Sequence, residues 1–300
     1  VSKNQTAEHK DIQVAALTSN PAQYTTAVVA NSSIVPLLSD GLIRPLDDLV
    51  AKHGQSLNKN QLVTIDGKVM AIAFMANAQH LFYRSDILEK AGVDVPTTYE
   101  DVIAASKAIR AAGIMEYPFA LNTKSGWNLA EEFVNMYMGT GAPIFKAGTA
   151  EPSVNNEHGV ATLNMLKKLV AYSNPDYLTY DSNATQALWE SGELAIATMW
   201  GSRGGAMLDD EGSSAEVVSA TMLSGAPTWG GGSVPASTLW WDGFTIAQNI
   251  SDEDAEATFV AMMNGISTDM VKANNDKAVW LINGYVPGKA AEGIAQTANA

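Results

Sequence analysis

The stretch Gly67–Leu88, GKVMAIAFMANAQHLFYRSDIL, sets the architecture of this chain. It is a long extended apolar run, and the small and polar residues Ala76 and Asn77 interrupt it, so it predicts two strands with a break between them. Around it, short β-rich runs such as TTAVVANSS (25–33) alternate with helical ones. This alternation is typical of the α/β fold class.

Capping residues mark several of the helices. Thr98 is placed to cap a helix that ends at Gly113, and Ser251 caps the run DEDAEATFVAMMNGI. In the run from Asn156, Val160, Leu163, Leu166 and Leu169 recur at helical spacing. No Pro- or Ser-rich linker divides the chain, so two domains would have to be joined by strands.

Composition limits the classes of partner. The 300 residues are 46% hydrophobic and 17% charged, which indicates a globular protein of about two domains. The net charge of −14 disfavours nucleic acid and anionic membrane surfaces as partners. There are no cysteines, so disulfides and thiolate chemistry are excluded, and this fits a protein exported without disulfides.

The usual signatures of catalysis and cofactor binding are missing from the sequence. The four histidines are scattered without the spacing of metal ligands, and no G-x-S-x-G, P-loop or G-x-G-x-x-G motif follows a strand. Acidic runs at Asp209–Asp210 and Asp252–Glu256 are typical of a solvated loop and a helix N-terminus. We therefore expect no catalytic residues, no metal and no cofactor.

Tryptophans and polar side chains gather where predicted strands end. In an α/β domain, ligands bind outside the carboxyl ends of the strands. Aromatic faces stack on apolar C–H patches while Asp and Asn bind hydroxyls, which is the chemistry of sugar recognition. A tryptophan taken singly is more often a core residue than a ligand wall, but the set, with its polar neighbours at strand ends, favours a binding cleft. The candidate ligand-binding residues are Asn31, Ser32, Asn77, Gln79, Trp127, Trp200, Ser202, Arg203, Trp240, Trp241 and Asp242.

The run TWGGGSVPASTLWWDGFTI (228–246) joins a glycine triplet to a tryptophan pair. Pro235 and β-prone residues follow Gly230–Gly232, so no helix N-terminus is there to complete a phosphate site, and a turn is the better interpretation. Neighbouring residues on a strand point to opposite sides. We therefore expect one of Trp240 and Trp241 to face a ligand and the other to lie in the core.

Four segments together resemble the extracellular solute-binding proteins of ABC transporters, of the carbohydrate-binding type. The resemblance covers nearly the whole chain and implies a two-lobed α/β periplasmic-binding-protein fold that closes on a sugar and delivers it to a membrane permease. It implies an extracytoplasmic, periplasmic location, free or lipid-anchored, and a monomer. The segments are SDGLIRPLDDLV (39–50), the run from Gly67 to Ile109, LWESGELAIATMWGSR (188–203) and TLWWDGFTIAQNISDEDAEATFVAMM (238–263).

By position, the resemblance implies that Asn77 lies at a first crossing between lobes. It implies that Trp240, Trp241 and Asp242 lie at a second crossing. It places Trp200, Ser202 and Arg203 at the cleft-facing end of one element, and Trp127 and Asn31 more loosely in the cleft. The expected lobes are residues 1–76 with 244–285, and 77–243 with 286–300. Family members usually begin with a further strand and helix and end with further helices, which we expect this chain to lack.

Two other functions stay open. A protein of the same fold could bind a polyamine or another small polar solute, which an acidic cleft without a second stacked aromatic would favour. A carbohydrate-active hydrolase would need two carboxylates facing one pocket, about 5 to 10 Å apart.

Overall fold

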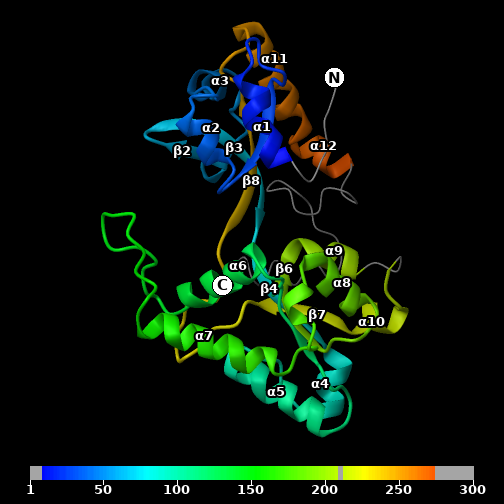
Figure 1. Cartoon of the computed structure of the whole chain (residues 1–300). Helices are drawn as coiled ribbons and strands as arrows, with labels where there is room; N and C mark the ends of the chain where they lie inside the picture. The colour runs from blue at the N-terminus through cyan, green and yellow to red at the C-terminus, as the bar shows by residue number, and fades with distance from the viewer. Residues whose placement is uncertain (1–8, 209–211, 274–300) are drawn as a thin grey trace. The chain divides into compact units, whose positions relative to one another are not determined.

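The structure is a computed structural model that describes residues 9–208 and 212–273 (Figure 1). The chain forms two compact units, and each has its own four-stranded sheet. Among the described residues, unit 1 contains those up to Asn77 and those from Leu239 onward, and unit 2 contains Ala78–Thr238. The chain therefore passes between the units twice, at a first crossing after Asn77 and a second after Thr238. The expected assignments of residues 274–300 lie outside the described residues.

Unit 1 has the strand order β1-β8-β3-β2, and every neighbouring pair is antiparallel. Its central strand β8 comes from the far end of the chain. Its elements are α1 (His9–Thr18), β1 (Thr26–Ala30), α2 (Ile34–Ser39), α3 (Asp47–His53), η1 (Lys59–Gln61), β2 (Leu62–Ile65), β3 (Lys68–Asn77), β8 (Trp240–Ile246), α11 (Asp252–Gly265) and α12 (Thr268–Ala273).

Alternation along β8 divides the core of unit 1 into two clusters. Phe244 and Ile246 point to the cluster that contains Phe259 of α11, and the Phe244 and Phe259 rings meet edge to face with centroids 6.3 Å apart. Trp241 points to the opposite cluster, which contains Leu17 of α1. Helices thus cover both faces of the sheet, and each face excludes water from its own set of apolar side chains.

Unit 2 has the strand order β5-β6-β4-β7, in which only β5 and β6 are parallel. Its elements are β4 (Gln79–Arg84), α4 (Ser85–Ala91), α5 (Tyr99–Ala111), β5 (Phe119–Ala120), α6 (Trp127–Met138), α7 (Glu157–Val170), η2 (Tyr177–Thr179), α8 (Ser182–Glu190), β6 (Ile196–Trp200), η3 (Gly201–Arg203), α9 (Gly204–Met207), α10 (Ala215–Ala220) and β7 (Thr221–Gly225).

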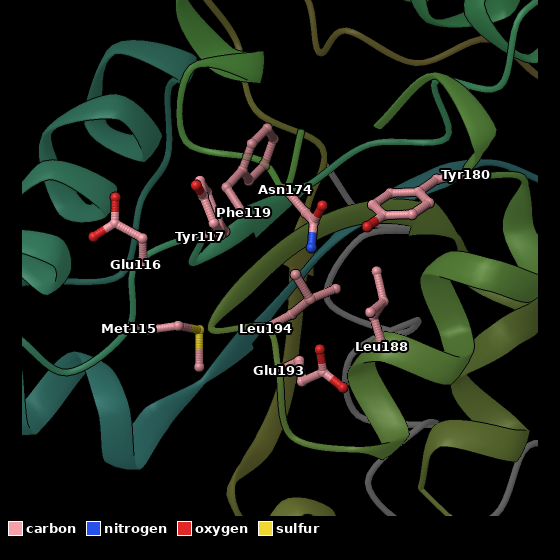
Figure 2. A pocket seen from close by; sticks show the side chains of 9 residues that line it. All are labelled: Met115, Glu116, Tyr117, Phe119, Asn174, Tyr180, Leu188, Glu193 and Leu194. Carbon is pink, nitrogen blue, oxygen red and sulfur yellow. The ribbon is translucent and has the colours of Figure 1, made fainter. Parts of the chain in front are cut away.

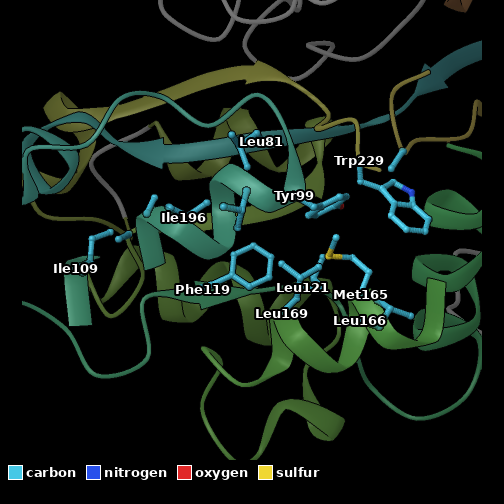
Figure 3. Packing of buried hydrophobic residues seen from close by; sticks show 14 of the residues in the cluster. Leu81, Tyr99, Ile109, Phe119, Leu121, Met165, Leu166, Leu169, Ile196 and Trp229 are labelled. Carbon is cyan, nitrogen blue, oxygen red and sulfur yellow. The ribbon is translucent and has the colours of Figure 1, made fainter. Parts of the chain in front are cut away.

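The two faces of the unit 2 sheet also carry separate clusters. Leu81 and Ile196 pack with residues of α5, α6 and α7, including Tyr99 and Leu169 (Figure 3). The next residues along the same strands point the other way, so Phe82 packs edge to face on Trp189 of α8 with ring centroids 6.1 Å apart.

Most local predictions are confirmed. The apolar stretch is two strands, β3 and β4, separated by Ala78 alone. Thr98 caps α5 by accepting the backbone N–H of Asp101, and Ser251 caps α11 by accepting that of Asp254. The glycine triplet is a turn, with positive φ at Gly230 and Gly231.

Two predictions are wrong. A helix does precede β1: α1 buries Ala16 and Leu17, although its apolar residues form only a weak pattern. In α7, Val160 and Leu163 are exposed, and the buried face consists of Thr162, Met165, Leu166 and Leu169. A row spaced by three residues falls about 60° short of a full turn at each step, so it winds off the buried face.

Gly243 gives a test of the β8 pairing. A Cβ at this position would lie 2.8 Å from the Ile72 carbonyl oxygen and 3.2 Å from Cζ3 of Trp241. We expect Gly243→Ala to lower the free energy of unfolding of the protein by about 1 to 3 kcal/mol, because both neighbours are held by the sheet and core. Urea unfolding followed by circular dichroism measures it. Gly265→Ala is the control, since a Cβ there meets nothing within 4 Å. Equal stabilities of the two variants would contradict the packing of β8.

Candidate functional site

In unit 1, the candidate residues lie at one end of the sheet. Strand pairing sets Ala30 opposite Asp242 and Asn77 opposite Trp240, so the end of β1, the end of β3 and the start of β8 coincide. Asn31 follows β1 directly. Its side chain accepts from the Trp241 N–H and donates to the Leu239 carbonyl oxygen, both at 3.5 Å. Asn31 and the adjacent Ser32 are exposed, whereas Asn77 is buried.

The tryptophan pair of β8 divides as the alternation predicts. Trp241 packs on the core cluster of α1 and β1. Trp240 lies on the other face together with Asp242, and its indole N–H donates to the Asp242 carboxylate at 3.3 Å. The half-buried Trp240 and Asp242 thus place an aromatic ring beside a carboxylate. A ring can stack on the C–H face of a sugar, and a carboxylate can accept hydrogen bonds from hydroxyl groups.

In unit 2, a second group of candidates lies at one end of the other sheet. β4 begins at Gln79, which pairs with Trp200, the last residue of β6. Because β5 runs parallel to β6, the residues after β5 reach the same end. That segment leads to Trp127, the first residue of α6, whose side chain is 57% exposed. Trp200 and Gln79 are instead buried, at 7% and 2% exposure.

Ser202 and Arg203 lie in η3, directly after Trp200. Arg203 Nη1 donates to Oε1 of Gln186 at 3.0 Å. Burial lowers the pKa of Arg203, and the carboxylates of Asp181 and Glu190 raise it again. The guanidinium is therefore held by side chains of its own unit and remains charged.

Sequence reasoning missed a buried polar network behind these residues. The Oε1 oxygen of Glu132 accepts from Gln79 Nε2 at 2.9 Å and from the Asn122 backbone N–H at 3.1 Å. Burial raises the pKa of Glu132 to about 8, although these donors lower it. Asn128, Glu132 and Asn135 lie at i, i+4 and i+7 of α6 and are all buried. This polar row at helical spacing was the available signal.

A pocket lies elsewhere in unit 2. It encloses about 200 Å³ beside the residues that precede β5 and β6, among them Tyr117, Tyr180 and Leu194 (Figure 2). Trp200 lies at the opposite end of β6, and Gln79 pairs with it from β4. The pocket therefore includes none of the candidate residues.

Four further features concern the part of the chain that the structure describes. The N–H of Gly230 donates to the Glu100 carboxylate at 2.8 Å, which leaves an acidic partner where a phosphate would have to bind. Burial lowers the pKa of His80, so it is neutral in its place in β4. Residues 9–208 and 212–273 contain no group of three or more acidic, His or Cys side chains arranged for a metal. Within them, no helix has the length and apolar character to cross a membrane.

Comparison with protein families gives a match to the model described as bacterial extracellular solute-binding protein, over residues 4–292. An ABC transporter extracellular-binding protein of Pyrococcus horikoshii, itself uncharacterised, is 25% identical over 58% of this chain and 41% of its own length. The sn-glycerol-3-phosphate-binding periplasmic protein UgpB of Agrobacterium fabrum is 26% identical over 53% of this chain and 39% of its own. The matches thus span about two-fifths of these relatives.

Solved structures share the fold. A solute-binding protein of Agrobacterium radiobacter K84 in complex with ribitol aligns with a TM-score of 0.77 and 22% identity, over 93% of this chain and 69% of that chain. Maltose-bound MalE3 of T. maritima aligns with a TM-score of 0.80 and 19% identity, over 98% of this chain and 77% of that chain. The described residues therefore have the two-lobed periplasmic-binding fold.

The opposite orientations of Trp240 and Trp241 generate a stability prediction. We expect Trp241→Ala to lower the free energy of unfolding by about 2 kcal/mol or more, because it removes a large ring that packs on the core cluster of unit 1. Trp240→Ala should cost less than half as much, since this ring lies outside that cluster. Urea titrations of both variants measure the difference, and a reversed order would contradict the orientations.

Proposed function

Because this chain belongs to the bacterial extracellular solute-binding protein family, we propose that it captures a sugar or sugar alcohol and delivers it to an ABC importer. The observation that carries the proposal is the placement of the candidate residues. In each unit they lie at the end of the sheet where the chain passes to the other unit. Both groups combine an aromatic ring with polar side chains, the combination that suits a ligand rich in hydroxyl groups.

The ligand class follows from the charges of these groups. Trp240 with Asp242 in unit 1 offers a ring and a hydrogen-bond acceptor, and exposed Trp127 in unit 2 offers a second ring. The one cation among the candidates, Arg203, is already bound to Gln186. An uncharged polyol needs no further cation, in keeping with a chain that has 18 basic and 32 acidic residues. Ribitol and maltose are the ligands of two proteins with this fold.

In the proposed mechanism, the ligand acts by selecting a closed state. Residues of both units contact the sugar, so the state in which they do so together gains binding energy that the open state lacks. The two crossings are the places where backbone rotation would be concentrated. We propose further that the protein is an extracytoplasmic monomer without catalytic activity, and that a membrane permease is its partner.

A ligand screen tests the proposal. The full chain is heated with ribitol, D-mannitol, maltose, glycerol 3-phosphate, spermidine and amino acids, each at increasing concentration. We expect a sugar or sugar alcohol to raise the melting temperature in a concentration-dependent way and to be recovered intact. A shift with spermidine alone would favour the polyamine alternative, and one with glycerol 3-phosphate alone a phosphorylated ligand. Recovery of a cleaved glycoside would overturn the proposal in favour of a hydrolase.

Trp127 allows a test in which folding is not disturbed. Its ring is more than half exposed, so Trp127→Ala should leave the melting temperature of the free protein unchanged within about 2 °C. Loss of ring stacking should weaken binding of the sugar found in the screen about fivefold to tenfold, as measured by calorimetry. Phe145→Ala is the matched control, an exposed aromatic of the same unit outside the candidate group. Unchanged affinity in Trp127→Ala would remove this residue from the site.

A further inference from the structure

Glu132 joins two segments of unit 2 that are not neighbours in the sheet. Its Oε1 oxygen accepts three hydrogen bonds: from Gln79 Nε2 at 2.9 Å, from the Asn122 backbone at 3.1 Å and from Asn122 Nδ2 at 3.3 Å. Gln79 begins β4, and Asn122 follows β5. Since β6 lies between these two strands, the carboxyl of Glu132 links the segments on both sides of the strand that ends at Trp200.

The same helix holds the second crossing. Asn135 Oδ1 accepts the backbone N–H of Thr238 at 2.8 Å, and Glu131 Oε1 accepts its hydroxyl at 2.7 Å. Ser237 Oγ in turn accepts the backbone N–H of Gln79 at 2.9 Å. Residues of α6 therefore hold the segments on the unit 2 side of both crossings. Of these residues, Glu132 is the one that binds the side chain of Gln79.

The network is buried, and some of its polar atoms lack a hydrogen-bond partner among the described residues. Glu132 is 2% exposed, and the buried oxygens Gln79 Oε1 and Asn122 Oδ1 have no hydrogen-bond partner among the residues that the structure describes. A buried amide that loses one of its remaining partners carries the full cost of its desolvation. The positions of Gln79 and Asn122 thus depend strongly on the side chain at position 132. Exposed amides would depend less on such a neighbour, because water could replace the lost hydrogen bond.

We propose that Glu132 is a positioning residue for the sugar site: its buried carboxyl holds Gln79 and Asn122 in place on either side of Trp200. The sugar part of this inference rests on the proposed function. Glu132 itself does not contact the ligand.

The titration of Glu132 makes the stability of the protein depend on pH. A residue at this position that acted by packing alone would not produce this dependence. Burial raises its pKa to about 8 from an ordinary value near 4.5, and the nearby titratable groups are Glu131 on the same helix and Tyr99 on α5. Between these two pKa values the folded protein holds a proton that the unfolded chain has released. The contribution of Glu132 to stability therefore falls as the pH rises from about 4.5 to 8, and is constant above that range.

Three variants separate the interpretations. Glu132→Gln keeps a neutral group of the same shape, Glu132→Leu removes the acceptor, and Glu89→Gln alters an exposed glutamate on α4 as a control. In ¹⁵N-labelled protein without ligand, hydrogen exchange of the Asn122 backbone amide is measured with the side-chain amide signals of Gln79. Glu132→Leu should speed exchange at Asn122 at least about tenfold, and Glu132→Gln should stay within about threefold of wild type.

The pH profile keeps the inference testable if Glu132→Leu does not fold. In the wild-type protein and in Glu89→Gln, the Gln79 amide signals should move with a midpoint near pH 8, and in Glu132→Gln this movement should be absent. Between pH 6 and 9 the melting temperature of Glu132→Gln should fall by at least about 3 °C less than that of Glu89→Gln. Signals of Gln79 that do not move in the wild-type protein, or wild-type exchange at Asn122 in Glu132→Leu, would overturn the positioning role.

Binding of ribitol, D-mannitol and maltose is then measured for the same variants. The inference expects Glu132→Leu to lose at least about tenfold in affinity and Glu132→Gln to stay within about threefold. If the wild-type protein binds none of these or any other sugar in the screen, the proposed function fails, and the exchange and pH data still decide whether Glu132 positions Gln79. If the positioning data agree but the affinities do not change, the link between Glu132 and the site is wrong.

Discussion

The pairing of β8 between β1 and β3 is the constraint on which unit 1 depends. Without this strand the sheet would be two separate pieces, because among the described strands β1 pairs with β8 alone and β3 would retain only β2. The pairing also fixes which side chains face which way. It sends Trp241 into the core beside α1, sends Phe244 to α11, and leaves Trp240 and Asp242 together on one face. A shift of the register by one residue would exchange these roles.

In unit 2 the corresponding arrangement relies on polar groups inside the protein. A carboxyl in the interior is costly unless it is protonated or fully hydrogen-bonded, and Glu132 combines three donors with a raised pKa. An apolar side chain at that place could pack as well, but it could not bind amides of two separate segments, Gln79 of β4 and Asn122 after β5.

Much of the fold could be predicted because its signals are local. The break after Asn77, the caps at Thr98 and Ser251 and the glycine turn each depend on a few adjacent residues. The two-residue strand β5 and the strand β7 exist only through partners distant in sequence, and no local pattern marks them. Glu132 was missed for a related reason. A charge in a helix is ordinarily solvated, and only the row it forms with Asn128 and Asn135 indicates an inward face.

Unit 1 is built from two separate segments of the chain, and this affects the order in which the two units can fold during synthesis. Unit 2 is one continuous segment, Ala78–Thr238 among the described residues, so all its strands are available as soon as that segment has left the ribosome. Unit 1 begins earlier but must wait for β8, and until then β1 and β3 each have an edge without the strand that pairs with it in the folded sheet. The later-encoded unit is thus free to fold first, and the early half-sheet keeps unpaired strand edges, which can pair with other chains, until β8 has been made.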